Sequence, residues 1–525
     1  MSMMAKPRYR VAAGSAPLPR QASIDTGLEA GRTGRRLSTW LPTRAHVNTL
    51  IAGSGGTVLA RSRYLGRNNG YAAGAIEAWA SASVATGIMP AWKVKGARQR
   101  KKGHELWRAW TDESDAEGLT DFYGQTRRAS RELYIAGEVF FRKRPRLLSD
   151  GLTVPLQLQM LPSEMLDPNF TTTAPNGNAI RQGIEFDRIG RRVAYHFWQE
   201  HPGDTTVSLA RSGERVRVPA SEVIHVLDPV EAGQIRGLTR FSAAMVKLWV
   251  LDGYDDAELE RKKTAALHAG FVTRTDPDGD LYDKAAEEAA KDADGIAVPT
   301  LEPGTMKVLL PGEDVKFSTP ADSGSSYEPF QYRTLLQVFM ALGIPYYEGT
   351  GDLKQANYSS LRQGMLKFRR SIEAFQHSVL VFQLCRTVWR WFLDAAVLAG
   401  ALDLPDYASN PKPYLVVEWI PPKWEWVDPF KDIKAEILAI VAGLKARSSV
   451  IKAMGGDPEQ VDEDRRDDRD REQSFGLSSS APGIGDNGGP PMDDEPGAGR
   501  QLNDNLASLM RLVKAFSADE ASAAA

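Results

Sequence analysis

The region from Tyr358 to Leu398 restricts the fold more than any other part of this sequence, because its apolar residues recur at helical spacing throughout. At ~1.5 Å per residue, one helix over this span would be roughly 60 Å long, far longer than a typical globular helix. The sequence therefore predicts a very long helix with room for a kink. Its apolar positions are Leu361, Met365, Phe368, Ile372, Phe375, Val379, Phe382, Val388, Trp391 and Phe392.

A turn-rich segment leads into this helix. Gly343 and Pro345 are expected to end a preceding helix over 330–342. Gly349 and Gly351 are expected to give the backbone freedom at this junction. The run Asn357, Tyr358, Ser359, Ser360 and Leu361 is expected to start the long helix.

Composition restricts the class of protein. The chain has 525 residues, 42% of them hydrophobic and 25% charged, which indicates a globular protein with several domains. A formal charge of −2 argues against a tight sequence-specific DNA reader. The single cysteine, Cys385, excludes an internal disulfide and fits a reducing cytoplasm. The apolar 372–400 region carries Arg386, Arg390 and Asp394, so we expect a soluble chain without membrane association.

The first half of the chain reads as a basic arm, then helices, then a mainly β module. Residues 1–40 are rich in arginine, which indicates either a solvated terminus, the favoured interpretation, or contact with an acidic partner or nucleic acid. Helices are expected over 61–88, with Gly87 near the end, over 106–122 and over 126–135. Strands are expected over 138–143, 156–161, 193–198, 215–218 and 222–227.

The second half has longer helices. A connector over 229–240 leads to a long helix over 241–268, and an excursion over 270–325 with short strands and a small helix near 282–292 separates it from the helix at 330–342. A strand is expected over 411–420, and helices over 428–444, capped by Asp428 with Pro429 in the first turn, and over 448–454. Residues 478–500 indicate a disordered linker, and 502–516 either a docking helix or an unstructured segment.

Catalytic and metal-binding motifs are missing. The sequence has no phosphate-binding loop, no His-Glu-x-x-His, no Gly-x-Ser-x-Gly and no Cys/His metal spacing. The cluster over 53–56, Gly-Ser-Gly-Gly, is interpreted as a loop, His225 as a satisfied core histidine, and Asp352 as a turn or capping residue. We therefore expect no catalytic residues, no metal and no cofactor, although an enzyme with dispersed residues stays open as the least favoured reading.

Several blocks in order resemble the lambda-type portal proteins of tailed bacteriophages, from about Trp40 to Glu463. Any one block is weak, but six in register are specific. They are Asn68-Asn69-Gly70-Tyr71 with Gly74 to Ile76; Gly233-Gln234-Ile235-Arg236-Gly237; Asp252 to Leu259; Gly343-Ile344-Pro345-Tyr346 with Gly351-Asp352; Asn357-Tyr358-Ser359-Ser360; and Asp428-Pro429 after Val427.

The resemblance implies an α+β portal-protein fold, with wing, stem, clip and crown, in a cyclic ring of about twelve copies, a dodecamer, at one capsid vertex. It also implies double-stranded DNA passing through the ring without sequence recognition, and as partners the large terminase subunit, the neck proteins of the head-tail connector, the major capsid protein and a scaffold. The implied parts are a basic arm (1–40), wing (41–240), first stem helix (241–269), clip (270–325), second stem helix (326–345), tunnel loop with long kinked helix and return strand (346–427), crown-like helices (428–463) and charged tail (464–525).

A channel for a polyanion favours few basic contacts, because each neutralised phosphate adds salt-dependent affinity and hence friction. Within the implied tunnel loop, at Gly349 to Asn357, we predict that Lys354 and Gln355 face the DNA. Exposure at an ordinary surface turn is an equally open reading of both residues. Another oligomeric scaffold or tail component is the main alternative function.

Overall fold

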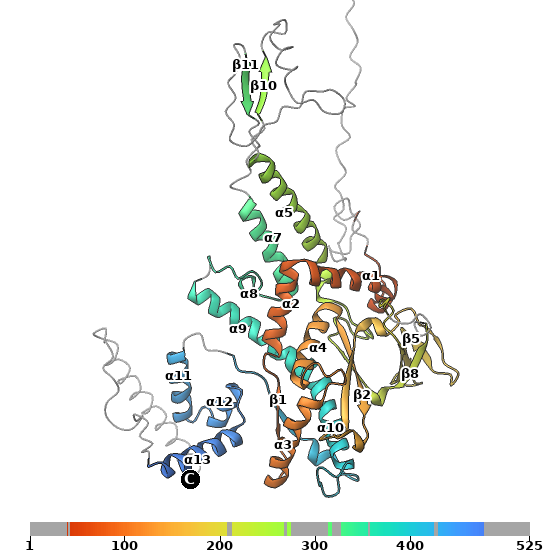
Figure 1. Ribbon diagram of the computed structural model, residues 1–525, viewed down its shortest axis with the longest axis vertical. Coiled ribbons are helices and arrows are strands. Elements are labelled where there is room, and N and C mark those ends of the chain that lie inside the picture. Colours follow the sequence, from red (N-terminus) through yellow and green to blue (C-terminus); the bar gives the residue numbers. More distant parts are fainter. Residues whose placement is uncertain are drawn as a thin grey trace, which may run out of the picture. The chain divides into compact units, whose positions relative to one another are not determined.

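The computed structural model describes two compact units, divided after Pro422, and the first of them mixes helices with strands (Figure 1). The expected α+β class is therefore confirmed. The basic arm, the small helix near 282–292 and the tail beyond 476 lie outside the described residues, as do Gln355 and Asp428. The described residues are 39, 42–206, 213–266, 270–274, 313–317, 327–354, 357–424 and 429–476.

Two helices stand where one was predicted over 61–88. α1 spans Val47–Asn68 and α2 spans Gly70–Ser83. Asn69 separates them, because it adopts an extended backbone and its side chain accepts a hydrogen bond from the N–H of Ala72 at 3.0 Å. The loop predicted over 53–56 is wrong, since these residues lie inside α1. Buried side chains such as Ile51 anchor that helix despite its glycines.

The next two helices are α3, Ala97–Glu113, and α4, Phe122–Ala136. The helix predicted over 106–122 therefore begins too late and ends too late. Asp121 explains the boundary, since its carboxylate accepts a hydrogen bond from the N–H of Gly124 at 2.7 Å and caps α4. α4 packs against α2, and the two helices enclose the rings of Trp79 and Tyr134, whose centroids are 5.5 Å apart.

The β module consists of two antiparallel sheets, and the five longer predicted strands are confirmed within one or two residues. Three very short strands, β4, β5 and β6, were not predicted because they are too brief to show alternation. One sheet has the order β3-β2-β9, from Leu156–Leu161, Glu138–Pro145 and Val223–Leu227. The other has the order β4-β5-β6-β7-β8, from Thr172–Thr173, Ala179–Arg181, Ile184–Phe186, Arg192–Trp198 and Arg215–Pro219.

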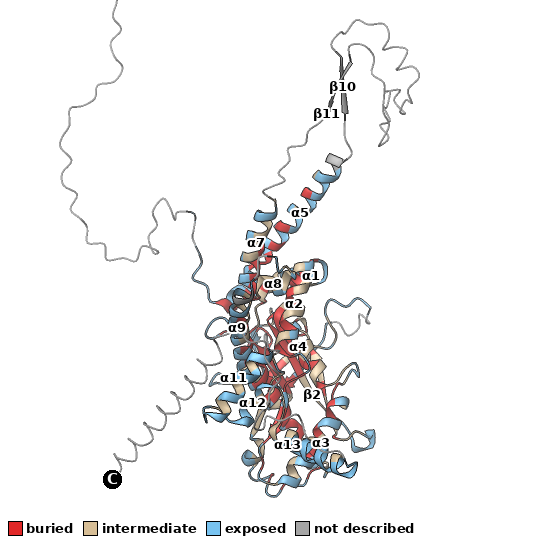
Figure 2. Ribbon diagram, turned by 90° about the vertical axis from the view of Figure 1, so that its left-hand side faces the viewer, coloured by how far each residue is buried: buried red, intermediate tan, exposed pale blue. Residues whose placement is uncertain are grey.

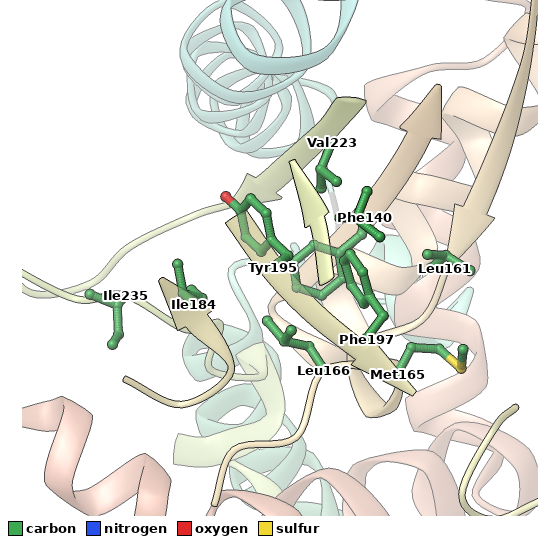
Figure 3. Close-up of a cluster of buried hydrophobic side chains, with 10 residues drawn as sticks. Phe140, Leu161, Met165, Leu166, Ile184, Tyr195, Phe197, Val223 and Ile235 are labelled. Carbon is green, nitrogen blue, oxygen red and sulfur yellow. The ribbon is translucent and has the colours of Figure 1, made fainter. Parts of the chain in front are cut away.

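Side chains from both sheets share one hydrophobic core (Figure 3). Phe140 of β2 meets Phe197 of β7 edge-on, with ring centroids 5.2 Å apart. Leu166 and Ile184, both fully buried, pack into the same cluster. This core joins the two sheets into one module.

Helices α5, Met245–Ala266, and α7, Tyr327–Leu342, pack against each other (Figure 1). α5 begins four residues later than predicted, because residues 240–243 form a 3-10 turn instead. Between the two helices, β10 (Gly270–Arg274) pairs with β11 (Glu313–Phe317) in an antiparallel ladder. The Tyr327 hydroxyl donates a hydrogen bond to Asp255 at 2.9 Å and ties the two helices together.

The long helical region is confirmed, and it holds a π-helical segment that the sequence did not locate. α9, Tyr358–Phe375, runs through a π-helical segment, Gln376–Cys385, into α10, Arg386–Leu398. In that segment Gln383 donates to the carbonyl of Leu227 at 2.9 Å and accepts from its N–H at 3.0 Å. The side-chain amide thus binds the end of β9 as a neighbouring strand would.

A short sheet closes the first unit. β1, Met89–Trp92, pairs antiparallel with β12, Val417–Ile420, so chain segments far apart in sequence lie side by side. The strand predicted over 411–420 is shorter than expected, because residues 412–415 form a 3-10 turn.

The second unit has three described helices, none with a buried residue: α11 (Pro429–Val441), α12 (Arg447–Ala453) and α13 (Pro458–Ser474) (Figure 2). α13 is capped by Asp457, whose carboxylate accepts a hydrogen bond from the N–H of Glu459 at 3.1 Å. The expected division between 463 and 464 falls inside this helix. Across the described part of both units, every helix is too short or too polar to cross a lipid bilayer.

Candidate functional site

The turn between α7 and α8 is built for a sharp change of direction. Gly343 has a φ of +74°, which an L side chain rarely adopts. The N–H of Ile344 donates to the carbonyl of Phe339 at 3.1 Å. Pro345 then precedes α8, Tyr346–Thr350, a single turn of helix. The predicted stop at Gly343 and Pro345 is confirmed.

Gly349 has a different role from the one predicted. It lies in α8 with an ordinary helical backbone, so it does not supply freedom at a hinge. A Cβ atom there would lie 2.0 Å from Cε1 of Phe339 on α7. Glycine is needed because the backbone of α8 touches the Phe339 ring directly. Gly351, by contrast, ends α8 with a φ of +71° and open space around it, as the sequence suggested.

Asp352 forms the turn that was predicted. Its carboxylate accepts a hydrogen bond from the N–H of Lys354 at 3.0 Å, and the hydroxyl of Tyr346 donates to it at 3.3 Å. Burial first, and the nearby Asp352 second, raise the pKa of Tyr346, which keeps the phenol a donor. These contacts hold the first half of the loop against α8.

Lys354 is at the exposed tip of the described loop. Its side chain is 79% exposed, and its ammonium is 4.0 Å from Glu328 at the start of α7, which is 82% exposed. A pair this open contributes little to stability. The charge of Lys354 is therefore available for a passing ligand.

The far end of the loop is fixed by a capping box. Asn357 accepts a hydrogen bond from the N–H of Ser360 at 2.8 Å, and the Ser360 hydroxyl accepts one from the N–H of Asn357 at 3.1 Å. The expected start of the long helix, with Tyr358 and Ser359 in its first turn, is confirmed. The loop is thus short and restrained at both ends.

The first predicted motif block joins three helices. Asn69 caps α2 and donates its amide to Asp252 of α5 at 3.2 Å. Tyr71 packs edge-on against Phe339, with centroids 6.4 Å apart, and its hydroxyl accepts from Gln331 at 3.4 Å. Asn68 is exposed and bonds back to its own helix, and Gly70 begins α2 in open space. This block supports α7 and, through it, the candidate loop.

The second block lies elsewhere, in the β module. Gly233 has a φ of +79°, and its carbonyl accepts from Asn48 of α1 at 2.9 Å. Gln234 accepts from the N–H of Val230 and donates to the carbonyl of Arg236. The structure therefore does not bring this block to the candidate loop.

Arg236 belongs to a buried charge cluster centred on Glu138, which the sequence reasoning missed. The guanidinium donates to Oε1 of Glu138 at 2.6 Å and 2.8 Å, and both side chains are less than 5% exposed. The Ser163 hydroxyl, the N–H of Gly237 and His225 Nε2 also donate to this carboxylate. A charged residue directly after Gly137 and before an apolar strand was the available signal.

For both Glu138 and His225, burial and the hydrogen-bonding neighbours shift the pKa in opposite directions. Burial alone would raise the pKa of Glu138, but Arg236 and His225 hold it well below its ordinary value. Burial lowers the pKa of His225 to about 4 against the opposing bond to Glu138, so the imidazole is neutral at pH 7. His225 is thus the satisfied core histidine that was predicted.

Gly237 completes the cluster sterically. A Cβ atom on it would lie 2.4 Å from the carbonyl carbon of Gly137, so the two chain segments touch. A cavity of about 350 Å³ opens beside α1 and is lined in part by Glu138, Arg236 and Gly237. Since both carboxylate oxygens of Glu138 accept hydrogen bonds, the cluster serves to hold β2, β9 and the 233–237 turn together.

Comparison with known proteins points the same way as the motif blocks. The family model described as "Phage portal protein, lambda family" matches residues 33–376. That match covers more than half of the chain and includes α1 to α9 with both motif blocks and the candidate loop. In the described part of the chain, no group of three or more His, Cys, Asp or Glu side chains could hold a metal ion.

Three curated relatives are phage proteins. A probable portal protein of Halomonas phage phiHAP-1 is 29% identical over 321 residues, 61% of this chain and 61% of that protein, so this match spans less than two thirds of the relative. Portal protein B of Escherichia phage lambda is 23% identical over 82% of this chain and 86% of its own length. The portal protein of Escherichia phage N15 is 22% identical over 82% and 87%.

Solved structures give weaker likenesses. A chain in the neck of a native GTA particle, computed with C12 symmetry, has 16% identity and a TM-score of 0.44, covering 77% of this chain and 94% of that one. A chain in the virion of a native gene transfer agent has 15% identity and the same TM-score, covering 79% and 100%. The family assignment rests on the sequence matches.

Proposed function

This chain belongs to the lambda family of phage portal proteins, and we propose that it forms a closed ring of about twelve copies through which double-stranded DNA is packaged and ejected. The family expected from the motif blocks is confirmed. The protein is accordingly a structural component of the virion neck, part of the head-tail connector, and not an enzyme.

The ring is supported by apolar side chains left open on α5. Val246, Trp249 and Val250 are 70%, 58% and 62% exposed, and their spacing places them on one side of the helix. A contiguous apolar face of this kind is typical of an interface. In a cyclic assembly each copy offers two different faces to its neighbours, so this face would be covered by the next copy.

The parts of the ring follow from the element order. We assign the wing to 41–240, the stem helices to 241–269 and 326–345, and the clip to 270–325. The loop, long helix and β12 at 346–427 form the path from the channel into the wing. Residues 428–463 form the crown, and 1–40 and 464–525 are the terminal arm and tail.

The tunnel loop, at Gly349 to Asn357, is the proposed contact with DNA. The observation that carries this assignment is Lys354, exposed at the tip of a short loop whose two ends are fixed by the Asp352 turn and the Asn357 cap. One lysine per copy would give a single ring of weak, non-specific phosphate contacts, which guides a polyanion without holding it. Gln355 would lie beside it.

The partners follow from position. The clip, between α5 and α7, would dock the large terminase subunit during packaging and the neck proteins afterwards. The wing and crown would meet the major capsid protein and, during assembly, a scaffold. Assembly would take place in the host cytoplasm, and the finished ring would stay at one vertex of the virion.

Replacing Lys354 with glutamate tests the loop assignment. We expect less DNA per particle, because a ring of carboxylates at the tunnel loop would repel phosphates. Lys102→Glu on α3, an exposed site of the same charge change, is the control and should package normally. Equal DNA content in both variants would contradict the assignment, while leaving the family membership untouched.

A further inference from the structure

A cavity of about 330 Å³ lies between α10 and the strand β12, remote from the tunnel loop in sequence. Its walls are Arg386, Trp389 and Arg390 on one side and residues 415–417 with Trp419 on the other. Arg386 lies 28 residues after Tyr358 in the long helical region, which corresponds to roughly 40 Å along the helix at ~1.5 Å per residue.

Two positive charges at this cavity are uncompensated. Arg386 and Arg390 are one helical turn apart and both exposed. Neither guanidinium forms an ion pair within the described residues, and Arg386 contacts the ring of Phe382, whose centroid is 5.5 Å away. Two neighbouring guanidinium groups without a carboxylate partner favour binding of an anion.

Two hydrogen-bond donors at the same cavity are also unpartnered. The indole nitrogens of Trp389 and Trp419 are buried and have no acceptor in the described structure. Trp389 is only 1% exposed, so bulk water does not satisfy it. Since neither nitrogen has accessible surface, a ligand in the cavity would meet the apolar ring surfaces of the two tryptophans and not their N–H groups.

The rest of the wall is apolar, with two tryptophan rings beside Leu415, Val416 and Val417. The rings of Trp389 and Trp419 are perpendicular with centroids 6.3 Å apart, and Trp389 also packs against Trp92 at 5.7 Å. The Trp92 indole, in contrast, has its acceptor, the carbonyl of Tyr414 at 2.7 Å. A ligand that fits such walls combines an apolar stem with a terminal oxygen anion.

We propose that this cavity binds a carboxylate side chain of an acidic peptide segment presented by another protein subunit. The methylene stem of a glutamate would pack on the indole rings. Its carboxylate would accept hydrogen bonds from Arg386 and Arg390. The cavity holds a side chain of this size, and a planar guanidinium matches the planar carboxylate. The proposal concerns a protein docking site and does not depend on the tunnel loop.

The experiment uses the full chain and a simple probe, N-acetyl-hexaglutamate amide, with hexaglutamine amide as the uncharged comparison, in calorimetric titrations at low salt. We expect the glutamate peptide to bind and the glutamine peptide not to. The double variant Arg386→Gln/Arg390→Gln should weaken binding by about tenfold or more. Trp419→Ala, which removes one ring from the wall, should weaken it several-fold.

The matched control is Arg188→Gln/Arg191→Gln, in which two exposed arginines of the β6–β7 turn are lost with the same change of charge. It should bind the glutamate peptide as the parent does. Circular dichroism checks that each variant is folded.

Three results would overturn the proposal. One is no binding of the glutamate peptide at millimolar concentration. Another is equal weakening by the two arginine pairs, which would indicate general charge attraction. The third is a preference of this cavity for inorganic phosphate or a DNA duplex over the peptide, seen as loss of those ligands in Arg386→Gln/Arg390→Gln alone.

Discussion

Gly349 and Phe339 are in such close contact that a Cβ atom on the glycine would lie 2.0 Å from Cε1 of the ring. The contact joins α8 to α7, and Tyr71 packs edge-on with the same ring. The tunnel loop therefore starts from a packed junction. Movement of the loop would have to occur beyond it, at Gly351, where the backbone is left-handed and unobstructed.

Gly349→Ala should destabilise the protein by about 1–3 kcal/mol, because the added methyl group forces Phe339 or α8 to shift. Urea denaturation measures the difference. Gly53→Ala, in the open middle of α1, is the control and should raise the free energy of unfolding by up to about 1 kcal/mol. If Gly349→Ala and Gly53→Ala changed the free energy of unfolding equally, α8 would not touch Phe339.

Glu138→Gln should cost about 3–5 kcal/mol, since it leaves Arg236 charged and buried without a counter-ion. The control is Glu117→Gln, which removes an exposed pair with Arg128 at 3.4 Å and should cost less than about 1 kcal/mol. Chemical denaturation at pH 7 compares them. A cost for Glu138→Gln as small as that of the control would mean that Arg236 finds another partner or water.

The free energy of unfolding should depend on pH through the protonation of His225. Burial lowers its pKa in the folded chain to about 4, whereas in the unfolded chain it is near 6.5. Between these values the unfolded state binds the extra proton, so the free energy of unfolding falls as the pH drops from about 6.5 to 4. Glu138, whose pKa is depressed, adds a loss only at still lower pH.

His225→Gln tests this. Its stability should change less than that of the parent chain between pH 6.5 and 5, measured by denaturant titration at each pH. If the two curves stay parallel, His225 is not the group that titrates.

Cys385 should be inert to thiol reagents in the folded protein. It is fully buried in the π-helical segment, and burial raises its pKa to about 12. Because the chain has one cysteine, labelling reports on opening of the long helix alone. We expect no labelling of the native chain and one label per chain in denaturant. Rapid labelling of the native protein would show that this helix opens.

Much of this fold could be read from local patterns. The strand over 156–161, the helix ending at Gly343 and the start of the long helix at Asn357 are coded by alternation, a stop signal and a capping box. Each depends on residues close in sequence. The π-helical segment was not located because its geometry follows from contacts such as Gln383 with Leu227, 156 residues away.

The predictions that failed also depended on contacts that local sequence patterns do not encode. The glycines over 53–56 favour a loop locally, but the buried face of α1 overrides them. Gly349 resembled a hinge, although its role depends on a ring ten residues earlier in the chain. Glu138 and Arg236 are 98 residues apart, and only the folded module pairs them.

The central claim is that copies of this chain close into a ring whose channel is lined by the tunnel loop. Cryo-electron microscopy of the purified full-length protein tests it most directly. The account predicts a closed ring with an opening wide enough for a DNA duplex and Lys354 among the side chains nearest the axis. A closed ring with Lys354 on its outer surface, or an assembly without a central opening, would contradict it.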